Sequence, residues 1–412
     1  MYRQWMKDVP LYQALLGVES PWKVADVQMD MTAKEIEIEV ICTQKVWACP
    51  KCRTRMHVHS WNERRWRHLD TCQFKTFVRA NVPRVECPEH GTQTVQVPWA
   101  EVRSRFTEMF ERLAIDVMLE CSINAAGKIL RISWEEADGI KQRAVKRGLG
   151  RKPPSSPKKI CIDEKSVGRG HDYVSLVIQV DEKGPSIDYI ASGRTEEALK
   201  PYWEGLSDEA LQGIECVAMD MWDPFVKSVR AHVPDADSKI VHDPFHLVQH
   251  MNKAVDAVRR HEVNLLPSKD SKPLKGTRQM WLYGIENLPK KWASNLKAFK
   301  DSKFKTARAW HLKEMFRGLY RCENLTQAHA YWKEWNLSAM KSKLEPVKKV
   351  ARMIKERIDQ VLTFFVHRHT NAHAESMNSR IQAMIKKANG YRNRERLCTD
   401  MFFHFGGLNL HP

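Results

Sequence analysis

The sequence predicts a multidomain α/β protein, in which a mixed sheet follows a cysteine-containing module and three short helices. Three observations predict this organisation. At about 150 residues per domain, 412 residues correspond to two to four domains. Two similar cysteine knuckles stand in the first hundred residues. Beyond residue 158, strand-like runs come first in a meander and then alternate with helix-like runs, which is typical of a mixed sheet.

Composition excludes several classes of protein. The 42% of apolar residues can build real cores, so the chain is not wholly disordered. No apolar run approaches the roughly 18 residues that a bilayer crossing needs. The start of the chain, Met1 to Lys7, lacks the apolar stretch of a secretory signal. We therefore expect a cytoplasmic protein with no membrane contact, whose ten cysteines are reduced and serve metal binding rather than disulfides.

The net charge of +17 is unevenly distributed. Residues 1–150 carry a net +4, residues 151–240 a net −4, and residues 241–412 a net +17. The basic C-terminal region favours a polyanionic partner such as DNA, because each neutralised phosphate releases condensed counterions. A solvated helical surface would have a similar composition. The acidic middle region concentrates carboxylates inside an otherwise basic protein.

The first elements in the chain are two strands, over residues 22–29 and 35–42, in which apolar and polar residues alternate. Two knuckles follow, Cys49-Pro-Lys-Cys52 and Cys87-Pro-Glu-His90. Each presents two ligands from a tight turn, and two such turns can complete a tetrahedral zinc site. The fourth ligand is the least secure, because other histidines and a cysteine lie between the knuckles: His57, His59, His68 and Cys72.

The segment between the knuckles is strongly basic. Residues 44–84 hold ten Lys and Arg against two acidic residues. Zinc would therefore organise a small module suited to DNA phosphates. The arginines predicted to contact DNA are Arg53, Arg55, Arg64, Arg65 and Arg67.

Three short helices are predicted next. Apolar residues over 106–119 recur at three- and four-residue spacing, a shorter helix covers 124–130, and Ser133 and Glu136 have the spacing of a capping box that opens the third. Gly148 fits the end of that third helix, and residues 148–157 are a linker by composition. The pattern resembles a helix-turn-helix, although a plain helical connector also fits. Its predicted DNA contacts are Lys141, Arg143, Lys146 and Arg147.

The mixed sheet is predicted from alternating elements. Strand-like runs cover residues 159–163, 173–180, 186–191, 214–219 and 238–242, with helices over 195–205 and 223–232 between the later strands. A long helix starts near Pro244, and residues 245 to about 365 are helical and basic. The tryptophans of this region are expected to anchor a helical core, with stacking on unpaired bases as the alternative.

Three acidic residues are candidates for a catalytic site. Asp163 and Asp220 each follow an apolar strand-like run, and Glu375 lies at the start of a helix. Three hard oxygen donors could hold two Mg²⁺ ions that act in phosphoryl transfer. Strand-end carboxylates are usually turn or cap residues, so neighbours compete for the same role: Asp223, Asp243 and Glu164.

The order of these parts resembles the bacterial ISL-three family of DDE insertion-sequence transposases. The similarity spans nearly the whole chain and is carried by the two knuckles, Ile162-Asp-Glu-Lys165, Asp220-Met-Trp-Asp-Pro-Phe225, Val241-His-Asp-Pro-Phe-His-Leu247, Arg259-Arg260, and the segment from Glu375 to Arg392. The resemblance implies an RNase H-like catalytic domain interrupted by a helical insertion, with Asp163, Asp220 and Glu375 as its catalytic triad.

The chain departs from the family pattern at two places. Ser376 follows Glu375 where the family often has glycine, and Pro244 follows Asp243 where it often has arginine. We therefore expect Asp243 and His246 to be structural or close to DNA rather than catalytic, and His373 to be a surface residue.

The resemblance implies a domain order: zinc-binding module 1–100, helix-turn-helix 101–150, catalytic domain 151–265, helical insertion 266–360 and last catalytic segment 361–412. It also implies a bacterial enzyme that binds terminal inverted repeats on double-stranded DNA, with structural Zn²⁺ and catalytic Mg²⁺ or Mn²⁺, cleaves and transfers strands, and works as a homodimer. Basic residues near Glu375 would hold phosphates: Arg380, Lys386, Lys387 and Arg392. A DNA-binding regulator without catalysis, and a nuclease without strand transfer, are the alternatives.

Overall fold

The computed structural model describes residues 9–168, 172–294 and 303–412. The chain forms two compact units, one of Met1–Lys152 with Phe402–Pro412 and one of Pro153–Met401. The last residues of the chain, which the sequence placed with the catalytic segment, thus group with the N-terminal unit. Residues 1–7, on which the expectation about a secretory signal rests, lie outside the described residues.

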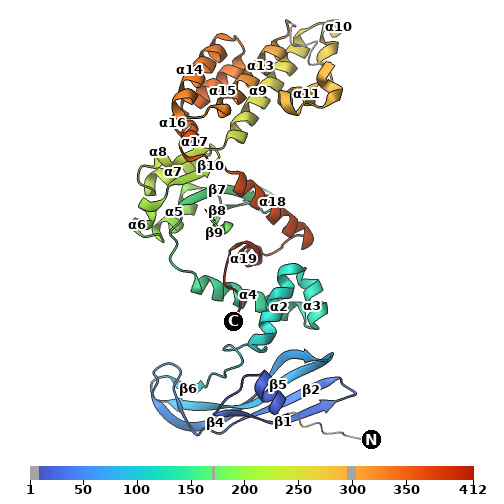
Figure 1. The fold of residues 1–412 in the computed structure, drawn as a ribbon, viewed down its shortest axis with the longest axis vertical. Coiled ribbons are helices and arrows are strands. Elements are labelled where there is room, and N and C mark those ends of the chain that lie inside the picture. Colours follow the sequence, from blue (N-terminus) through green and yellow to red (C-terminus); the bar gives the residue numbers. More distant parts are fainter. Residues whose placement is uncertain (1–8, 169–171, 295–302) are drawn as a thin grey trace. The chain divides into compact units, whose positions relative to one another are not determined.

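A six-stranded sheet follows the short helix α1 (Val9–Leu15) in the N-terminal unit (Figure 1). Its order is β1-β2-β5-β4-β3, with β6 paired to β5. The strands are β1 (Trp22–Asp30), β2 (Glu35–Cys42), β3 (Val46–Ala48), β4 (Arg55–Thr71), β5 (Phe74–Cys87) and β6 (Gly91–Thr94). The first two strands confirm the sequence prediction. The long β4–β5 hairpin was not predicted, because its charged residues obscure the alternation.

Three helices complete this unit: α2 (Glu108–Glu120), α3 (Ile123–Leu130) and α4 (Trp134–Arg151). The predicted capping box of α4 is present, with the Ser133 hydroxyl accepting from the Glu136 backbone and the Glu136 carboxylate from the Ser133 backbone. The predicted end at Gly148 is wrong, since the helix continues to Arg151. A Cβ at Gly148 would lie 2.7 Å from the Leu408 Cβ, so glycine permits close packing here instead of ending the helix.

The second unit contains the predicted mixed sheet, in the order β11-β10-β7-β8-β9. Strand β7 runs parallel to β10 and antiparallel to β8, and β10 runs parallel to β11. The strands are β7 (Lys159–Ser166), β8 (Tyr173–Asp181), β9 (Gly184–Ser192), β10 (Cys216–Met219) and β11 (Ile240–His242). The intervening helices are α5 (Glu196–Glu204), α6 (Asp208–Gly213), α7 (Asp223–His232) and α8 (Ala236–Lys239). Only α6 and α8 were not predicted.

The two faces of this sheet have different neighbours. Ile160 and Ile162 of β7 share a core with Leu199 of α5 and Phe225 of α7. Helix α18 (Ala372–Lys387) packs against β7, β8 and β9. Cys161, between the two isoleucines, contacts His369 just before α18, with 3.4 Å between Sγ and Nε2. Because neighbouring side chains of a strand point to opposite faces, Asp163 faces the side of α18.

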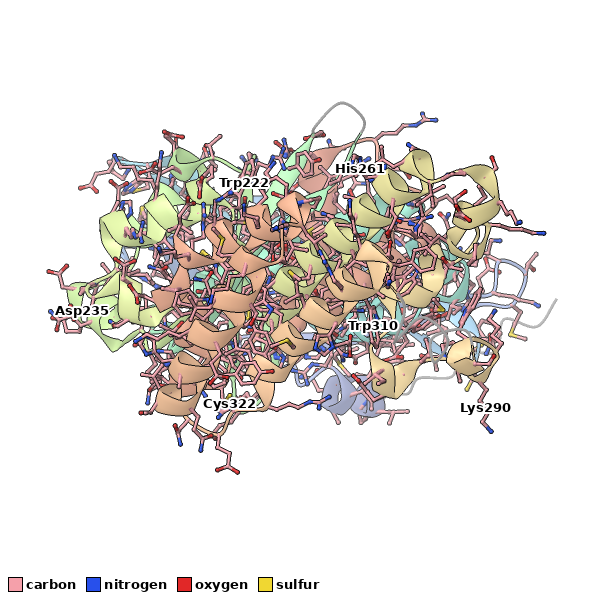
Figure 2. All side chains as sticks on the ribbon, turned by 90° about the horizontal axis from the view of Figure 1, so that it is seen from above. Trp222, Asp235, His261, Lys290, Trp310 and Cys322 are labelled. Atoms are coloured by element: carbon pink, nitrogen blue, oxygen red, sulfur yellow. The ribbon has the colours of Figure 1, made fainter. Side chains whose placement is uncertain are left out.

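The region from residue 245 to about 365 was predicted to be helical, and its described residues are mainly helical. Its core contains the buried tryptophans Trp281, Trp310, Trp332 and Trp335, which confirms their role as anchors (Trp310 is labelled in Figure 2). Its helices include α9 (Pro244–Leu265), α10 (Ser268–Ser271), α11 (Arg278–Leu282), α13 (Lys305–Gly318), α14 (Leu325–Lys341), α15 (Glu345–Lys355), α16 (Ile358–Leu362) and α17 (Phe364–His367), and α19 (Arg394–Phe405) follows α18. Across the described part of the chain, no helix has the length and apolar character to cross a membrane.

Candidate functional site

The two knuckles lie together and form a four-residue metal site. The candidate ligand atoms of Cys49, Cys52, Cys87 and His90 all lie within 4.8 Å of one another. The Sγ atoms of Cys52 and Cys87 are 3.5 Å apart, and the His90 Nδ1 lies 3.5 Å from the Cys87 Sγ. Hydrogen bonding with Thr54 lowers the pKa of Cys52 to about 6, which favours the thiolate that binds metal. Three sulfurs and one imidazole nitrogen are the donors of a structural zinc site.

The structure also resolves the open question of the fourth ligand. His68 is buried and its Nδ1 lies 2.9 Å from the Thr107 hydroxyl, while burial lowers its pKa to about 4. His59 pairs with Glu86 at 3.2 Å. Cys72 is exposed in the β4–β5 turn with a φ of 48°. His90 therefore completes the site, as the matching knuckles predicted.

Strand pairing brings the first two catalytic candidates side by side. Met219 pairs with Ile162 in the parallel β10–β7 ladder, so the next residues, Asp220 and Asp163, leave that ladder together. The prediction that Asp163 ends its strand is wrong, because β7 continues to Ser166 alongside β8. Asp163 marks instead the point at which the parallel pairing with β10 ends.

Glu375 enters the same site from α18, and His246 of α9 lies between it and the second carboxylate. The Nδ1 of His246 is 2.7 Å from Asp220 Oδ1 and 4.0 Å from Glu375 Oε1. His246 and Glu375, with Asp243, also form a group whose ligand atoms lie within 4.8 Å of one another. His246 thus belongs to the carboxylate cluster, which the sequence did not predict.

Helix α18 is joined to β7 by an asparagine that sequence reasoning also missed. The Asn378 amide donates to Asp163 Oδ2 at 2.6 Å and to the Glu164 carbonyl at 3.3 Å. The Lys165 ammonium donates in turn to the Asn378 carbonyl at 3.2 Å. Asn378 follows Glu375 by three residues, so both lie on one face of α18. That spacing is the signal that could have found it.

The competing acidic residues have other partners. Glu164 pairs with Arg194 at 2.9 Å, and the largely exposed Asp223 pairs with Arg357 at 2.8 Å. Asp243 accepts from the Phe245 backbone at 2.6 Å and caps α9, and its other oxygen accepts from the Asn371 backbone at 2.9 Å. Asp243 therefore connects α9 to the start of α18, and it also belongs to the group with His246 and Glu375 that could hold a metal ion.

The electrostatics of the cluster follow from burial and like charge. Burial and the neighbouring Asp220 charge together raise the pKa of Asp163 to about 6. Burial, Asp243 and Asp220 also raise the pKa of Glu375. The contact with Asp220 raises the pKa of His246, which favours the protonated imidazole beside the carboxylates.

The donor set suits a hard divalent cation. Asp163, Asp220 and Glu375 offer carboxylate oxygens, and the buried Asn378 Oδ1 has no hydrogen-bond partner among the described residues. Such oxygens are the ligands that Mg²⁺ and Mn²⁺ take in proteins. A cation would also remove the repulsion that raises the carboxyl pKa values. The residues present therefore fit a catalytic divalent ion.

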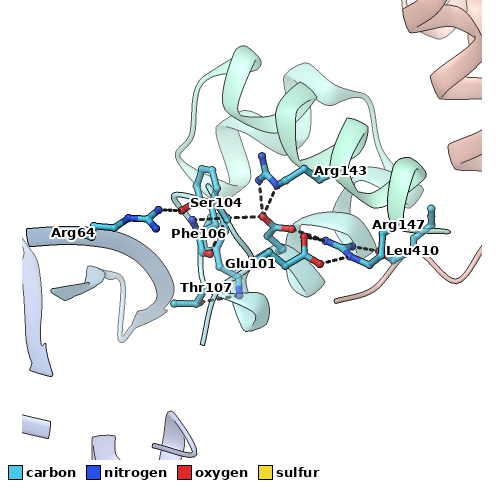
Figure 3. Close-up of polar contacts among 10 residues, drawn as sticks. Arg64, Glu101, Ser104, Phe106, Thr107, Arg143, Arg147 and Leu410 are labelled. Atoms are coloured by element: carbon cyan, nitrogen blue, oxygen red, sulfur yellow. Dashed lines mark hydrogen bonds and ion pairs between the residues drawn. The ribbon is translucent and has the colours of Figure 1, made fainter. Parts of the chain in front are cut away.

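Several predicted DNA-binding residues of α4 have structural roles instead. Arg147 donates to Glu101 at 2.6 and 2.8 Å, to Glu111 at 3.0 Å and to the Leu410 carbonyl (Figure 3). Arg143 donates to the fully buried Glu111 at 3.0 and 2.5 Å. Lys141 is buried, with its Nζ 5.6 Å from the Phe403 ring centroid. Arg143 and Arg147 thus pair with the buried Glu111, and Lys141 is itself buried, whereas Lys146 is exposed.

The arginines of the zinc module divide in the same way. Arg67 is buried, donating to the His68 and Thr76 carbonyls and pairing with Asp70, so it too is withdrawn from the DNA-binding set. Arg64 donates to the Ser104 carbonyl at 2.9 Å (Figure 3), and Arg65 pairs with Glu35 at 2.9 Å. The exposed candidates, on the zinc module and near Glu375, are Arg53, Arg55, Arg65, Arg380, Lys386, Lys387 and Arg392.

An RNase H-like sheet that gathers carboxylates, in a chain with a zinc ribbon and three short helices, defines a DDE-type enzyme that acts on DNA. Comparison with family models agrees with this class. Residues 160–401 match the ISL3 transposase domain, residues 45–90 the zinc finger of transposases IS204, IS1001, IS1096 and IS1165, and residues 95–145 the helix-turn-helix domain of the ISL3 transposase family. The chain belongs to the ISL3 family of transposases.

Full-length relatives agree with the family assignment. The chain is 26% identical over 430 residues to the transposase for insertion sequence element IS1557 of Mycobacterium tuberculosis, covering 95% of this chain and 94% of the relative. It is 24% identical over 360 residues to the transposase for element IS1001 of Bordetella parapertussis, covering 86% and 87%. The resemblance stated from the sequence motifs is confirmed, as are the zinc ribbon, the helix-turn-helix and the catalytic class.

Proposed function

We propose that this transposase binds the terminal inverted repeats of its insertion sequence, cleaves the 3′ ends and joins the freed hydroxyls to target DNA. The observation that supports this proposal best is the convergence of Asp163, Asp220 and Glu375, residues from β7, the end of β10 and α18, at one edge of the sheet. Carboxylates that lie close together repel one another, and a bound cation would neutralise that repulsion.

The chain's own groups have distinct parts in this proposal. Asp163, Asp220 and Glu375 hold the catalytic cations. Mg²⁺ or Mn²⁺ would activate the attacking water or 3′ hydroxyl and stabilise the leaving oxygen. Asn378 orients Asp163 through its 2.6 Å hydrogen bond, and His246 holds Asp220 at 2.7 Å. Both contacts fix the carboxylates before DNA arrives.

The remaining parts serve DNA binding and assembly. The zinc ribbon and the helix-turn-helix bind the element ends. Their exposed arginines and Lys146 contact the DNA phosphates. Three basic residues follow Glu375 on α18 and on the segment after it, namely Lys386, Lys387 and Arg392. They hold the DNA backbone beside the carboxylate cluster. Because two element ends must be cut together, the active form is a homodimer. The enzyme works in the bacterial cytoplasm on nucleoid DNA.

A cleavage and joining assay tests this function. Full-length protein, Mg²⁺ or Mn²⁺ and DNA that carries the sequences flanking the reading frame are incubated, and nicked and joined products are separated. We expect both products from the native chain and neither from Asp163→Asn, Asp220→Asn or Glu375→Gln, each with near-native DNA affinity. Absence of cleavage by the native chain would favour a DNA-binding regulator, and cleavage without joining would favour a nuclease.

A further inference from the structure

Helix α2 carries apolar side chains on the face that it exposes to solvent (α2 is labelled in Figure 1). Met109 and Leu113 are each 43% exposed, and Leu119 is 38% exposed. Met109 and Leu113 line one groove of about 460 Å³, whose other apolar walls are Leu69 and Pro412. An apolar groove with charged residues at its rim is typical of a protein–protein interaction site.

Two opposite charges stand on the same face of α2, between these apolar residues. Arg112 and Asp116 are exposed and line the groove. They are four residues apart, a spacing at which they could pair within the helix. Arg112 nevertheless has no ion-pair partner among the residues that the structure describes. Asp116 lies 2.7 Å from the His411 Nε2, and 53% of its side chain remains exposed. The surface thus presents a cation and an anion side by side.

The order of these residues is self-complementary in an antiparallel helix pair. Met109, Arg112, Asp116 and Leu119 recur at three- and four-residue spacing and form one stripe along α2. The stripe is symmetric about Ala114. When two copies of it pack antiparallel, Met109 meets Leu119 of the partner subunit, and Arg112 meets Asp116 of the partner subunit. Each contact occurs twice, as a two-fold interface requires.

Charge also selects this arrangement over the alternatives. A parallel helix pair in register would place Arg112 against the partner's Arg112 and Asp116 against the partner's Asp116, and such like charges repel. In the antiparallel register, like charges meet only where Glu108 faces the partner's Glu120, at the helix ends, where water and salt screen them. Leu113 is next to the centre of the stripe, so its two copies approach each other near the two-fold axis.

We propose that the exposed face of α2 is the surface through which two copies of this chain form a dimer, as an antiparallel α2 pair. This inference rests on the proposed function, which requires two copies of the chain but assigns no surface to their contact. Leu69 and Pro412 extend the apolar contact beyond the helices. One helix pair is smaller than the interface of a tight dimer, so the free protein should associate in a concentration-dependent way.

Analytical ultracentrifugation of the full-length protein, without DNA, tests this surface by exchange of charges. With rising concentration, the native chain should shift from the mass of one chain toward that of two. Arg112→Asp places two acids opposite each other and Asp116→Arg two arginines, so each should raise the dimer dissociation constant at least about tenfold. The double variant, with both substitutions, again pairs opposite charges and should return to within about threefold of the native constant.

Controls separate the α2 surface from folding and from the proposed function. Ile129→Asp introduces a charge at a 63% exposed position of α3 and should leave the dissociation constant unchanged. Circular dichroism checks the fold of each variant, and if one single variant unfolds, the other decides the question. A native chain that stays a single chain at every soluble concentration, folded single variants that associate like the native chain, or a double variant without rescue would overturn the surface. A native chain that dimerises as proposed but does not cleave DNA would contradict the proposed function alone.

Discussion

Asp163 is a carboxyl group whose surroundings oppose its charge. Burial and Asp220 hold its pKa at about 6, above the ordinary 3.8, so the folded state binds this proton more tightly than the unfolded state. Without metal, ionised Asp163 therefore lowers the free energy of unfolding progressively as the pH rises from about 4 to above 6. Without a cation, the ionised carboxylates therefore destabilise the folded state, and a bound cation would remove that destabilisation.

Replacement of this residue gives a prediction with a defined sign. Metal-free Asp163→Asn should have a higher free energy of unfolding than the native chain at pH 8, by about 1 to 3 kcal/mol, because the substitution removes a buried charge. At pH 4 the difference should nearly vanish, since the native carboxyl is then protonated in the fold. Urea unfolding at both pH values measures this. A variant that is less stable at pH 8 would contradict the assigned burial and repulsion.

At the scale of elements, helix α4 shows how the fold separates cations with buried partners from exposed ones. Glu111 of α2 is 1% exposed and accepts from Arg143, Arg147 and the Ser104 hydroxyl, which joins α2 to α4 and to the preceding loop. Lys146, on the same helix, is exposed. The sequence presents all these cations as one basic run, but the fold buries Lys141, pairs Arg143 and Arg147 with Glu111 and leaves Lys146 exposed.

Two substitutions test this division. Glu111→Ala removes the buried carboxylate that Arg143 and Arg147 share, although Arg147 keeps Glu101, so we expect a loss of about 3 kcal/mol in the free energy of unfolding. Lys146→Ala should change that free energy by less than about 0.5 kcal/mol but weaken DNA binding and its salt dependence. Chemical unfolding and binding titrations report the two quantities. The opposite pattern would return Arg143 and Arg147 to the DNA-binding set.

Most elements could be predicted from the sequence, because local periodicity and capping specify them. The strands of the mixed sheet, the three short helices and the buried tryptophans all follow from such patterns. The β4–β5 hairpin could not be predicted, since its exposed face carries a run of charged residues. The partners of Arg67 and Arg147 could not be predicted either. Their carboxylate and carbonyl partners lie far away in the sequence, so the residues next to a buried arginine look the same as those next to an exposed one.

In the candidate site, too, contacts between residues far apart in the sequence could not be predicted. The three acids and the four zinc ligands were predicted, the acids with the help of the family resemblance. His246 and Asn378 were not, because their roles depend on contacts with Asp220 and Asp163 that only the folded chain brings about.

At the scale of the whole molecule, the zinc ribbon and the mixed sheet belong to different compact units. A small metal module folds only with its metal, so loss of zinc should affect the first unit and leave the second folded. Cys49→Ser should lose bound zinc and at least about tenfold in affinity for the element end, while the unfolding transition of the second unit is unchanged. Zinc analysis, binding titration and calorimetry measure these effects. Full specific binding by zinc-free protein would contradict the role assigned to the ribbon.

The central claim is that Asp163, Asp220 and Glu375 hold divalent cations together. Fe²⁺ bound in place of Mg²⁺, with ascorbate and peroxide, cleaves the polypeptide next to its own ligands, and mass spectrometry maps the cuts. We predict cuts near residues 163, 220 and 375 that appear together, compete with Mg²⁺ and disappear together in Asp163→Asn. Cuts near only one of these residues, or cuts that survive in that variant, would contradict a shared site.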